Sequence, residues 1–285
     1  MPNSYIIASG HDNYLRYFKV SANEAINVKS LEAHKAWVRS LTKCNHYLAS
    51  GSDDSTLKIW KFNKNEELEQ IQVVNSSENS KGYFWSLSYL DNGLIAAGRG
   101  QNDSFSIRVW DFENMEKSQA CYGHRNIVRS LLVIDKTLVS ASDDGSLKIW
   151  NCENFKLIKT VLAHKKAIIC MAFNRKLWIL ATVGNDCLIK FWCLKGLFRC
   201  FNSIQVEEKV LTMANFEKFG LLVSGSENGF LRFWDWIDGS NKVWVSIGME
   251  IHSILCNEEE DLIINSDSSG KITVWKIYKN YHFIL

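Results

Sequence analysis

Short runs of alternating hydrophobic and polar residues recur along the whole chain. One of them is the run Leu-Lys-Ile-Trp at 57–60, which follows the polar cluster Ser-Asp-Asp-Ser at 52–55. Alternation with a period of two is typical of a β-strand that buries one face, and clusters of Asp, Asn, Ser and Gly are typical of tight turns. The pattern therefore predicts hairpins of short strands and almost no helix.

The hairpin pattern is repeated at a nearly constant interval. The segments LASGSDDSTLKIW, ending at Trp60, and LVSASDDGSLKIW, ending at Trp150, are near copies, and relaxed versions end at five other aromatic residues. The seven repeat-ending aromatics are Phe18, Trp60, Trp110, Trp150, Trp192, Trp234 and Trp275, at intervals of 42, 50, 40, 42, 42 and 41 residues. A sustained period of this length indicates one supersecondary unit repeated in space.

Each repeat contains four strand-like runs. In the unit around Trp150 the runs lie at 127–134, 137–141, 146–151 and 156–161. Four antiparallel strands per repeat match a blade of a β-propeller, and a closed ring of blades leaves no apolar end face exposed. The sequence therefore predicts an all-β fold in which residues 1–285 form one seven-bladed propeller of four-stranded antiparallel blades, with the ring closed near the N- and C-termini.

The way in which the ring closes stays open at this point. The first unit begins with the run 4–8, which corresponds to the second strand of a blade. The C-terminal run 281–285 is either the outer strand of the seventh blade or a substitute inner strand for the first. A three-stranded first blade, or a strand supplied by another chain, are the further alternatives.

The repeats resemble those of the WD-repeat (Trp-Asp repeat) family. The Gly-His signature is intact at 123–124, and the Trp-Asp pair is present at 110–111 and 234–235. The resemblance implies a buried relay of Trp, Ser or Thr, His and Asp within a blade. Matching spacing carries it to three sets: His34, Ser50, Asp54 and Trp60; His124, Ser140, Asp144 and Trp150; and His164, Thr182, Asp186 and Trp192.

A Ser beside a His and an Asp also suggests a nucleophilic triad, but three copies that each end in a tryptophan indicate a structural role. The chain contains no phosphate-binding glycine loop and no His-Glu-x-x-His motif. We therefore expect no enzyme activity, no metal, no cofactor and no small-molecule substrate.

Charge and hydropathy give no sign of a nucleic acid or membrane partner. The 33 Lys and Arg residues nearly balance the 31 Asp and Glu residues, which leaves a formal net charge of +2. No apolar run approaches the roughly 18 residues of a membrane span. The first residues lack the basic and apolar regions of a secretory signal, so we expect a cytoplasmic or nuclear location.

The candidate binding residues come from the innermost strand of each blade, whose side chains crowd the propeller axis. When the six full units are aligned on that strand, one position is filled in turn by Arg39, Trp85, Arg129, Ile169, Leu211 and His252. Arginine suits carboxylate or phosphate, and Trp is enriched at interface hot spots. We predict a binding site formed by Arg39, Trp85, Arg129 and Arg99, the last from a widened turn. The alternative is that the arginines pair with internal acids or stack on neighbouring side chains.

Three functions are consistent with these residues. The first is a non-catalytic protein-protein interaction scaffold, a subunit of a larger intracellular assembly. The second is a substrate receptor for acidic or phosphorylated peptides, because the WD-repeat receptors of ubiquitin ligases, which this chain resembles, use arginines at this strand position. The third is an RNA-associated assembly factor, for which a basic face with stacked aromatics would be required. We rank the scaffold first and the RNA-associated factor last.

Overall fold

The computed structural model describes most of the chain and divides it into two compact units. The described residues are 4–21, 24–64, 67–75, 82–90, 94–100, 105–111, 118–196, 198–278 and 283–284. We call the unit formed by Ile7–Arg16 and Ser30–Ala163 the N-terminal unit. The C-terminal unit is formed by Met1–Ile6, Tyr17–Lys29 and His164–Leu285.

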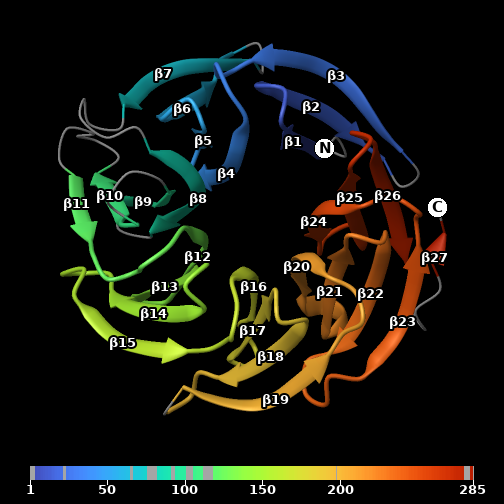
Figure 1. The fold of residues 1–285 in the computed structure, drawn as a ribbon. Coiled ribbons are helices and arrows are strands. Elements are labelled where there is room, and N and C mark those ends of the chain that lie inside the picture. Colours follow the sequence, from blue (N-terminus) through green and yellow to red (C-terminus); the bar gives the residue numbers. More distant parts are fainter. Residues whose placement is uncertain are drawn as a thin grey trace. The chain divides into compact units, whose positions relative to one another are not determined.

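The N-terminal unit contains three four-stranded antiparallel sheets whose strands follow chain order (Figure 1). The strands are β4 (Val38–Cys44), β5 (Tyr47–Ser52), β6 (Thr56–Phe62) and β7 (Leu68–Asn75); β8 (Tyr83–Leu90), β9 (Leu94–Gly100), β10 (Ile107–Asp111) and β11 (Ser118–Cys121); and β12 (Val128–Ile134), β13 (Thr137–Ser142), β14 (Ser146–Asn151) and β15 (Leu157–Leu162). The first strands of these sheets, β4, β8 and β12, lie next to one another in that order.

The C-terminal unit contains three further sheets of the same kind. Their strands are β16 (Ile168–Asn174), β17 (Ile179–Gly184), β18 (Leu188–Cys193) and β19 (Arg199–Gln205); β20 (Val210–Phe216), β21 (Leu221–Ser226), β22 (Phe230–Asp235) and β23 (Asn241–Ser246); and β24 (Ile251–Asn257), β25 (Leu262–Asp267), β26 (Ile272–Ile277) and β27 (Phe283–Ile284). One 3-10 turn, Glu217–Phe219, is the only helical element of the described residues, none of which forms a helix long and apolar enough to cross a membrane.

The prediction of seven four-stranded blades is wrong, because the described residues form six blades of this kind. The N-terminal repeat forms a smaller sheet of three strands, β1 (Ser4–Ser9), β2 (Tyr14–Val20) and β3 (Ala25–Glu32), in that order. The C-terminal tail does not supply its missing strand, because β27 pairs with β26 as the outer strand of the last sheet. The side chains of Ile6, Ile7 and Ala8 in β1 are consequently only partly buried. Closure of the sheets into a ring stays a prediction.

The strands follow directly from the local pattern. In β6 the side chains of Leu57 and Ile59 are completely buried, whereas Lys58 between them is partly exposed. The turn before β6 places Ser55 in a left-handed conformation with a φ of 68°, and the matching turn before β14 places Gly145 there with a φ of 77°. Small polar residues and glycine adopt this conformation most readily, which explains the composition of the turn clusters.

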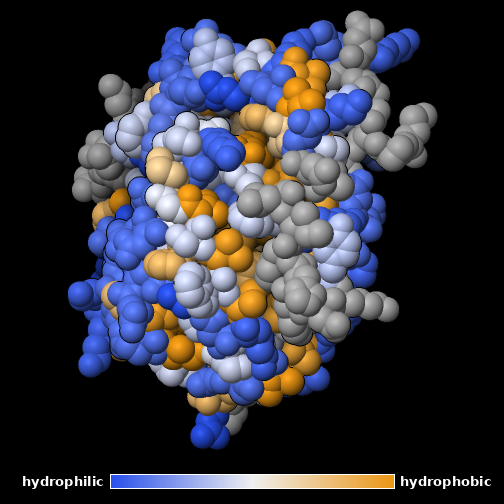
Figure 2. Space-filling model, turned by 90° about the vertical axis from the view of Figure 1, so that its right-hand side faces the viewer, coloured by the Kyte–Doolittle hydropathy of each residue, from blue (hydrophilic) through white to orange (hydrophobic). Residues whose placement is uncertain are grey.

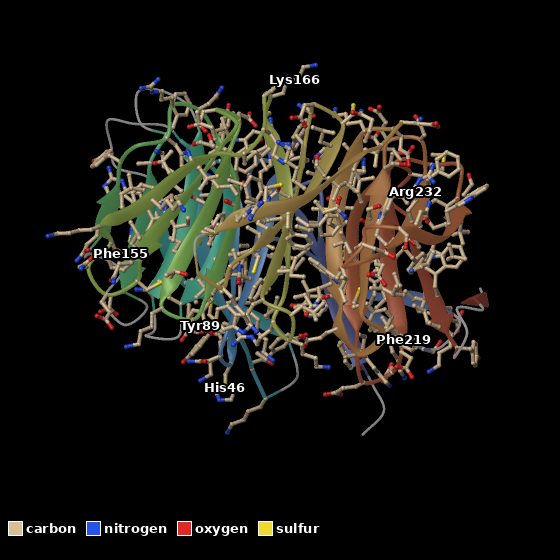
Figure 3. All side chains as sticks on the ribbon, turned by 90° about the horizontal axis from the view of Figure 1, so that it is seen from below. His46, Tyr89, Phe155, Lys166, Phe219 and Arg232 are labelled. Atoms are coloured by element: carbon tan, nitrogen blue, oxygen red, sulfur yellow. The ribbon has the colours of Figure 1, made fainter. Side chains whose placement is uncertain are left out.

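The hydrophobic cores lie between neighbouring sheets. One cluster joins Leu57 and Ile59 of β6 with Phe84 and Leu87 of β8. At one end of the N-terminal unit, where His46 and Tyr89 lie (Figure 3), a polar contact adds to this packing, because the side-chain amide of Asn45 donates to the hydroxyl of Tyr89 at 2.8 Å. Face-to-face packing of this kind holds the first strands in fixed positions, and these strands carry the candidate site.

Candidate functional site

A β-bulge displaces the predicted site position in every four-stranded sheet. In β4 the pairing with β5 shifts between Val38 and Ser40, so Arg39 is the extra residue. The same shift isolates Trp85 in β8 and Arg129 in β12. In the C-terminal unit the extra residues are Ile169, Leu211 and His252. A bulge re-aims a side chain away from the regular alternation of a strand, and bulges are frequent beside functional sites.

In the N-terminal unit, the structure brings Arg39, Trp85 and Arg129 together. The guanidinium carbon of Arg39 lies 4.2 Å from the ring centre of Trp85, and that of Arg129 lies 4.9 Å from the same ring. Both distances are within the range of a cation–π interaction. The indole of Trp85 therefore contacts two guanidinium groups, one from each of the neighbouring sheets.

Two aromatic rings extend this arrangement at the Arg39 side. The guanidinium carbon of Arg39 lies 4.6 Å from the ring centre of Trp37, and the imidazole of His11 stacks on Trp37 with a centroid distance of 4.0 Å and an interplanar angle of 11°. The resulting series is His11, Trp37, Arg39, Trp85 and Arg129, which we call the aromatic–arginine stack. Trp37 is 42% exposed, so the stack reaches the surface of the unit.

Each arginine of the stack is also held by an aspartate of the following turn. Arg39 donates through Nε and Nη2 to the carboxylate of Asp53, with the shortest bond 2.6 Å. Arg129 donates in the same way through Nε and Nη2 to Asp143. These ion pairs, each made through both Nε and Nη2, fix the plane of each guanidinium and neutralise its charge. The alternative interpretation of the arginines, pairing with internal acids and stacking on neighbours, is therefore what the structure shows.

Sequence reasoning missed two members of the stack. Trp37 precedes Arg39 by two residues, a spacing that puts both side chains on one face of an extended segment, and this signal could have found it. His11 lies in the turn between β1 and β2, where no local pattern indicates its role. Arg99 belongs to β9, where its backbone faces Phe84 of β8, and its side chain lies outside the described residues.

All three predicted relays are confirmed. In the sheet of β12 to β15, the indole of Trp150 donates to Ser140 Oγ at 2.9 Å. Ser140 Oγ lies 2.7 Å from His124 Nε2, and His124 Nδ1 lies 2.9 Å from the carboxylate of Asp144. The relays that end at Trp60 and Trp192 have the same connections. Within the described part of the chain, Trp234 and Trp275 keep only the indole bond, to Ser224 and Asn265 respectively.

The relay aspartates are ionised, and the relay hydroxyls are completely buried. Burial raises the pKa of Asp144, but hydrogen bonds with His124 and Ser146 lower it by more, so that the pKa lies well below its usual range. Burial also lowers the pKa of His164, which favours a neutral imidazole. Ser50, Ser140 and Thr182 are completely buried and each accepts an indole N–H, which is the behaviour of a structural bond.

Among the described residues no group of His, Cys, Asp and Glu side chains is arranged to hold a metal ion.

Comparison with known proteins identifies three segments of the chain that match one family model. The family model described as "WD domain, G-beta repeat" matches residues 26–61, 115–151 and 155–193. Each matched segment contains one complete relay and ends one residue after its tryptophan. The repeats that match are thus the ones in which the buried hydrogen bonds are complete.

Known proteins with similar sequences also carry these repeats. The chain is 30% identical over 166 residues, 56% of its length, to the probable coatomer subunit beta' of Schizosaccharomyces pombe. It is 24% identical over 229 residues, 78% of its length, to the human F-box/WD repeat-containing protein 10 and, over the same share, to the human F-box and WD repeat domain containing protein 10B. The matched regions span only 20%, 20% and 28% of these relatives.

Among solved structures, the crystal structure of the computationally designed Ika8 protein matches 97% of this chain and 82% of its own, with a TM-score of 0.72 and 18% identity. That likeness concerns the fold alone. The three family-model matches and the relays inside them show that residues 26–61, 115–151 and 155–193 of this chain are WD repeats.

Proposed function

We propose that this protein is a non-catalytic interaction scaffold, a WD-repeat subunit of a larger intracellular assembly, and that the aromatic–arginine stack is its principal partner site. The observation that carries the proposal is the stack itself. Trp and Arg are the side chains most enriched at interface hot spots, and here they are assembled before any partner arrives. Side chains held in place by ion pairs and stacking lose little conformational entropy on binding, which favours affinity.

The ion pairs favour a protein surface over an acidic or phosphorylated peptide as the occupant. The Nε and Nη2 groups of Arg39 and Arg129, which would bind a carboxylate or phosphate, already donate to Asp53 and Asp143. An anionic ligand would therefore meet a guanidinium whose charge is already neutralised and whose paired N–H edge is occupied. A partner that packs an apolar or aromatic group on the exposed face of Trp37 needs no such exchange.

The test compares the proteins recovered with wild type and with variants of the stack. Removing each pair together, as Arg39→Ala with Asp53→Ala and Arg129→Ala with Asp143→Ala, leaves no buried carboxylate without a partner. We expect the affinity for the partners that wild type recovers to fall about tenfold or more, because Trp37 and Trp85 lose the guanidinium groups that hold their rings in place, and a cation–π contact contributes about 0.5–2 kcal/mol.

Two further variants separate binding from folding. Trp37→Ala should weaken the same partners, whereas Phe62→Ala is the matched control, because Phe62 is an aromatic residue of the same unit with nearly equal exposure, 43% against 42%. Variants that melt like wild type and still bind every partner with unchanged affinity would refute the assignment of the stack as the partner site.

A further inference from the structure

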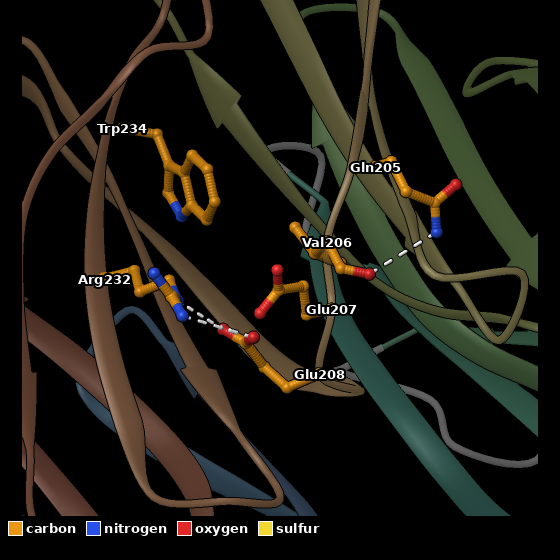
Figure 4. Close-up of a pocket in the computed structure, with 6 residues that line it drawn as sticks. All are labelled: Gln205, Val206, Glu207, Glu208, Arg232 and Trp234. Atoms are coloured by element: carbon orange, nitrogen blue, oxygen red, sulfur yellow. Dashed lines mark hydrogen bonds and ion pairs between the residues drawn. The ribbon is translucent and has the colours of Figure 1, made fainter.

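A pocket in the C-terminal unit lies where the relay of its sheet is incomplete. It has a volume of about 220 Å³ and is lined by Gln205, Val206, Glu207, Glu208, Arg232 and Trp234 (Figure 4). The first four residues follow one another at the end of β19 and in the connection to β20, and the last two belong to β22. This sheet is one of those without a relay histidine.

The position of Val206 explains why the space exists. The relay histidines His34, His124 and His164 each stand four residues before the first residue of an inner strand, and Val206 stands four residues before Val210, where β20 begins. In a relay sheet the imidazole lies against the indole, as in the pair His124 and Trp150 with a centroid distance of 6.4 Å. A valine side chain is shorter and does not fill that volume, so a cavity borders Trp234.

Charged side chains line the rest of the pocket. Arg232 donates to both carboxylate oxygens of Glu208, which is only 5% exposed. Glu207 is exposed, and its carboxylate points toward the space between Trp234 and the Arg232–Glu208 pair (Figure 4). Two carboxylates against one guanidinium give the lining a net negative charge. Since Glu208 is already paired, Glu207 is the group free to receive a cation among the described lining residues.

An exposed aromatic residue stands next to the pocket. Trp244 of β23 lies directly opposite Arg232 in the strand pairing, so both side chains are on the same face of the sheet. The ring of Trp244 is 56% exposed and packs edge-on against Phe230, with centroids 5.4 Å apart. Figure 2 shows hydrophobic residues among the hydrophilic ones at the surface of the molecule. An exposed Trp beside a charged pocket is typical of a contact for another protein.

We propose that this pocket binds one arginine side chain of a partner protein, with Trp244 as the contact for the residues beside that arginine. The guanidinium pairs with the carboxylate of Glu207 and lies against the indole of Trp234, which provides both a charge-assisted hydrogen bond and a cation–π contact. The volume is below the 300–1,000 Å³ typical of sites for drug-sized molecules and suits a single side chain. This site is independent of the aromatic–arginine stack.

The experiment titrates the full chain with the peptide acetyl-Gly-Arg-Gly-amide and follows the indole N–H signals by NMR. The Trp234→Phe variant identifies the signal of Trp234. We expect that signal to shift and saturate with the arginine peptide, and to stay in place with acetyl-Gly-Gln-Gly-amide, which has similar hydrogen-bonding groups but no charge. The Glu207→Gln variant should bind the arginine peptide about tenfold more weakly, because it loses the charge-assisted bond.

A matched control is available in the same unit. Glu227 is exposed and does not line the pocket, so Glu227→Gln removes the same charge elsewhere and should leave the affinity unchanged. Three results would overturn the proposal: a Trp234 signal that the arginine peptide does not move, an equal shift with the glutamine peptide, or an affinity that Glu207→Gln does not alter. None of these results depends on residues of the stack.

Discussion

Two serine hydroxyls, one bonded to a relay histidine and one at an equivalent position without a histidine, allow the stability contributed by the relay to be measured. Ser140 is completely buried, and its Oγ contacts both Trp150 Nε1 at 2.9 Å and His124 Nε2 at 2.7 Å. Ser224 is 2% exposed at the equivalent position of β21, and its Oγ accepts only the indole of Trp234, at 2.8 Å, among the described residues. The same Ser→Ala substitution therefore removes different numbers of bonds.

The expected magnitudes follow from the groups left without partners. Ser140→Ala leaves an indole N–H and an imidazole nitrogen unpaired in a buried place, whereas Ser224→Ala leaves only an indole N–H. Each unsatisfied buried group costs about 1–3 kcal/mol. We expect the free energy of unfolding to fall by about 2–6 kcal/mol in Ser140→Ala and by about 1–3 kcal/mol in Ser224→Ala. Ser50→Ala, in another relay, should resemble Ser140→Ala, because Ser50 makes the same two contacts.

The assay is equilibrium unfolding in urea, followed by both tryptophan fluorescence and circular dichroism. Two probes are needed because sheets in repeat proteins can unfold separately, and a single free energy holds only where the two transitions coincide. Equal losses for Ser140→Ala and Ser224→Ala would refute the reasoning, since they would show that the bond between hydroxyl and imidazole adds nothing to the stability of the relay sheet.

Two further predictions concern the relay residues. Asp54, Asp144 and Asp186 have a pKa below the ordinary value, because the lowering by hydrogen bonds outweighs the rise from burial. The stability that they contribute above pH of about 4 should therefore be lost as pH falls through the folded-state pKa. Burial lowers the pKa of His164, so the stability contributed by its neutral form should start to be lost below pH of about 6.5. Urea midpoints between pH 7 and 3 check this, and a stability that rises on acidification from pH 7 to 5 would contradict it. Gly184→Ala should destabilise the protein by about 1–3 kcal/mol, because a Cβ there would lie 2.6 Å from His164 Nδ1 and 2.8 Å from Asp186 Oδ1. The control is Gly10→Ala, whose Cβ would meet only Asp12 Oδ1 at 3.5 Å and which should be nearly neutral. Thermal melting of the two variants compares these effects.

The sequence by itself determined the features that depend on local pattern and repetition. The alternation of hydrophobic residues and the polar turn clusters predict the strands, because side-chain direction and turn conformation are set within a few residues. The relay around Trp150 was predicted from the resemblance to the WD-repeat family, and spacing assigned its residues, since the hydroxyl precedes the tryptophan by ten residues in every copy. Alignment of the repeats also selected Arg39, Trp85 and Arg129, because equivalent residues of similar sheets occupy equivalent places.

Only the tertiary structure decided which contacts these residues make. The tail strand β27 completes the last sheet instead of the first, which leaves six four-stranded blades, and no local signal distinguishes the two pairings. The charge of Arg39 is neutralised by Asp53 and its guanidinium is enclosed by Trp37 and Trp85. These partners come from separate turns and sheets, and their meeting depends on how the bulged strands pack. Contacts between distant segments are set by packing, whereas periodicity reports only which face of a strand is buried.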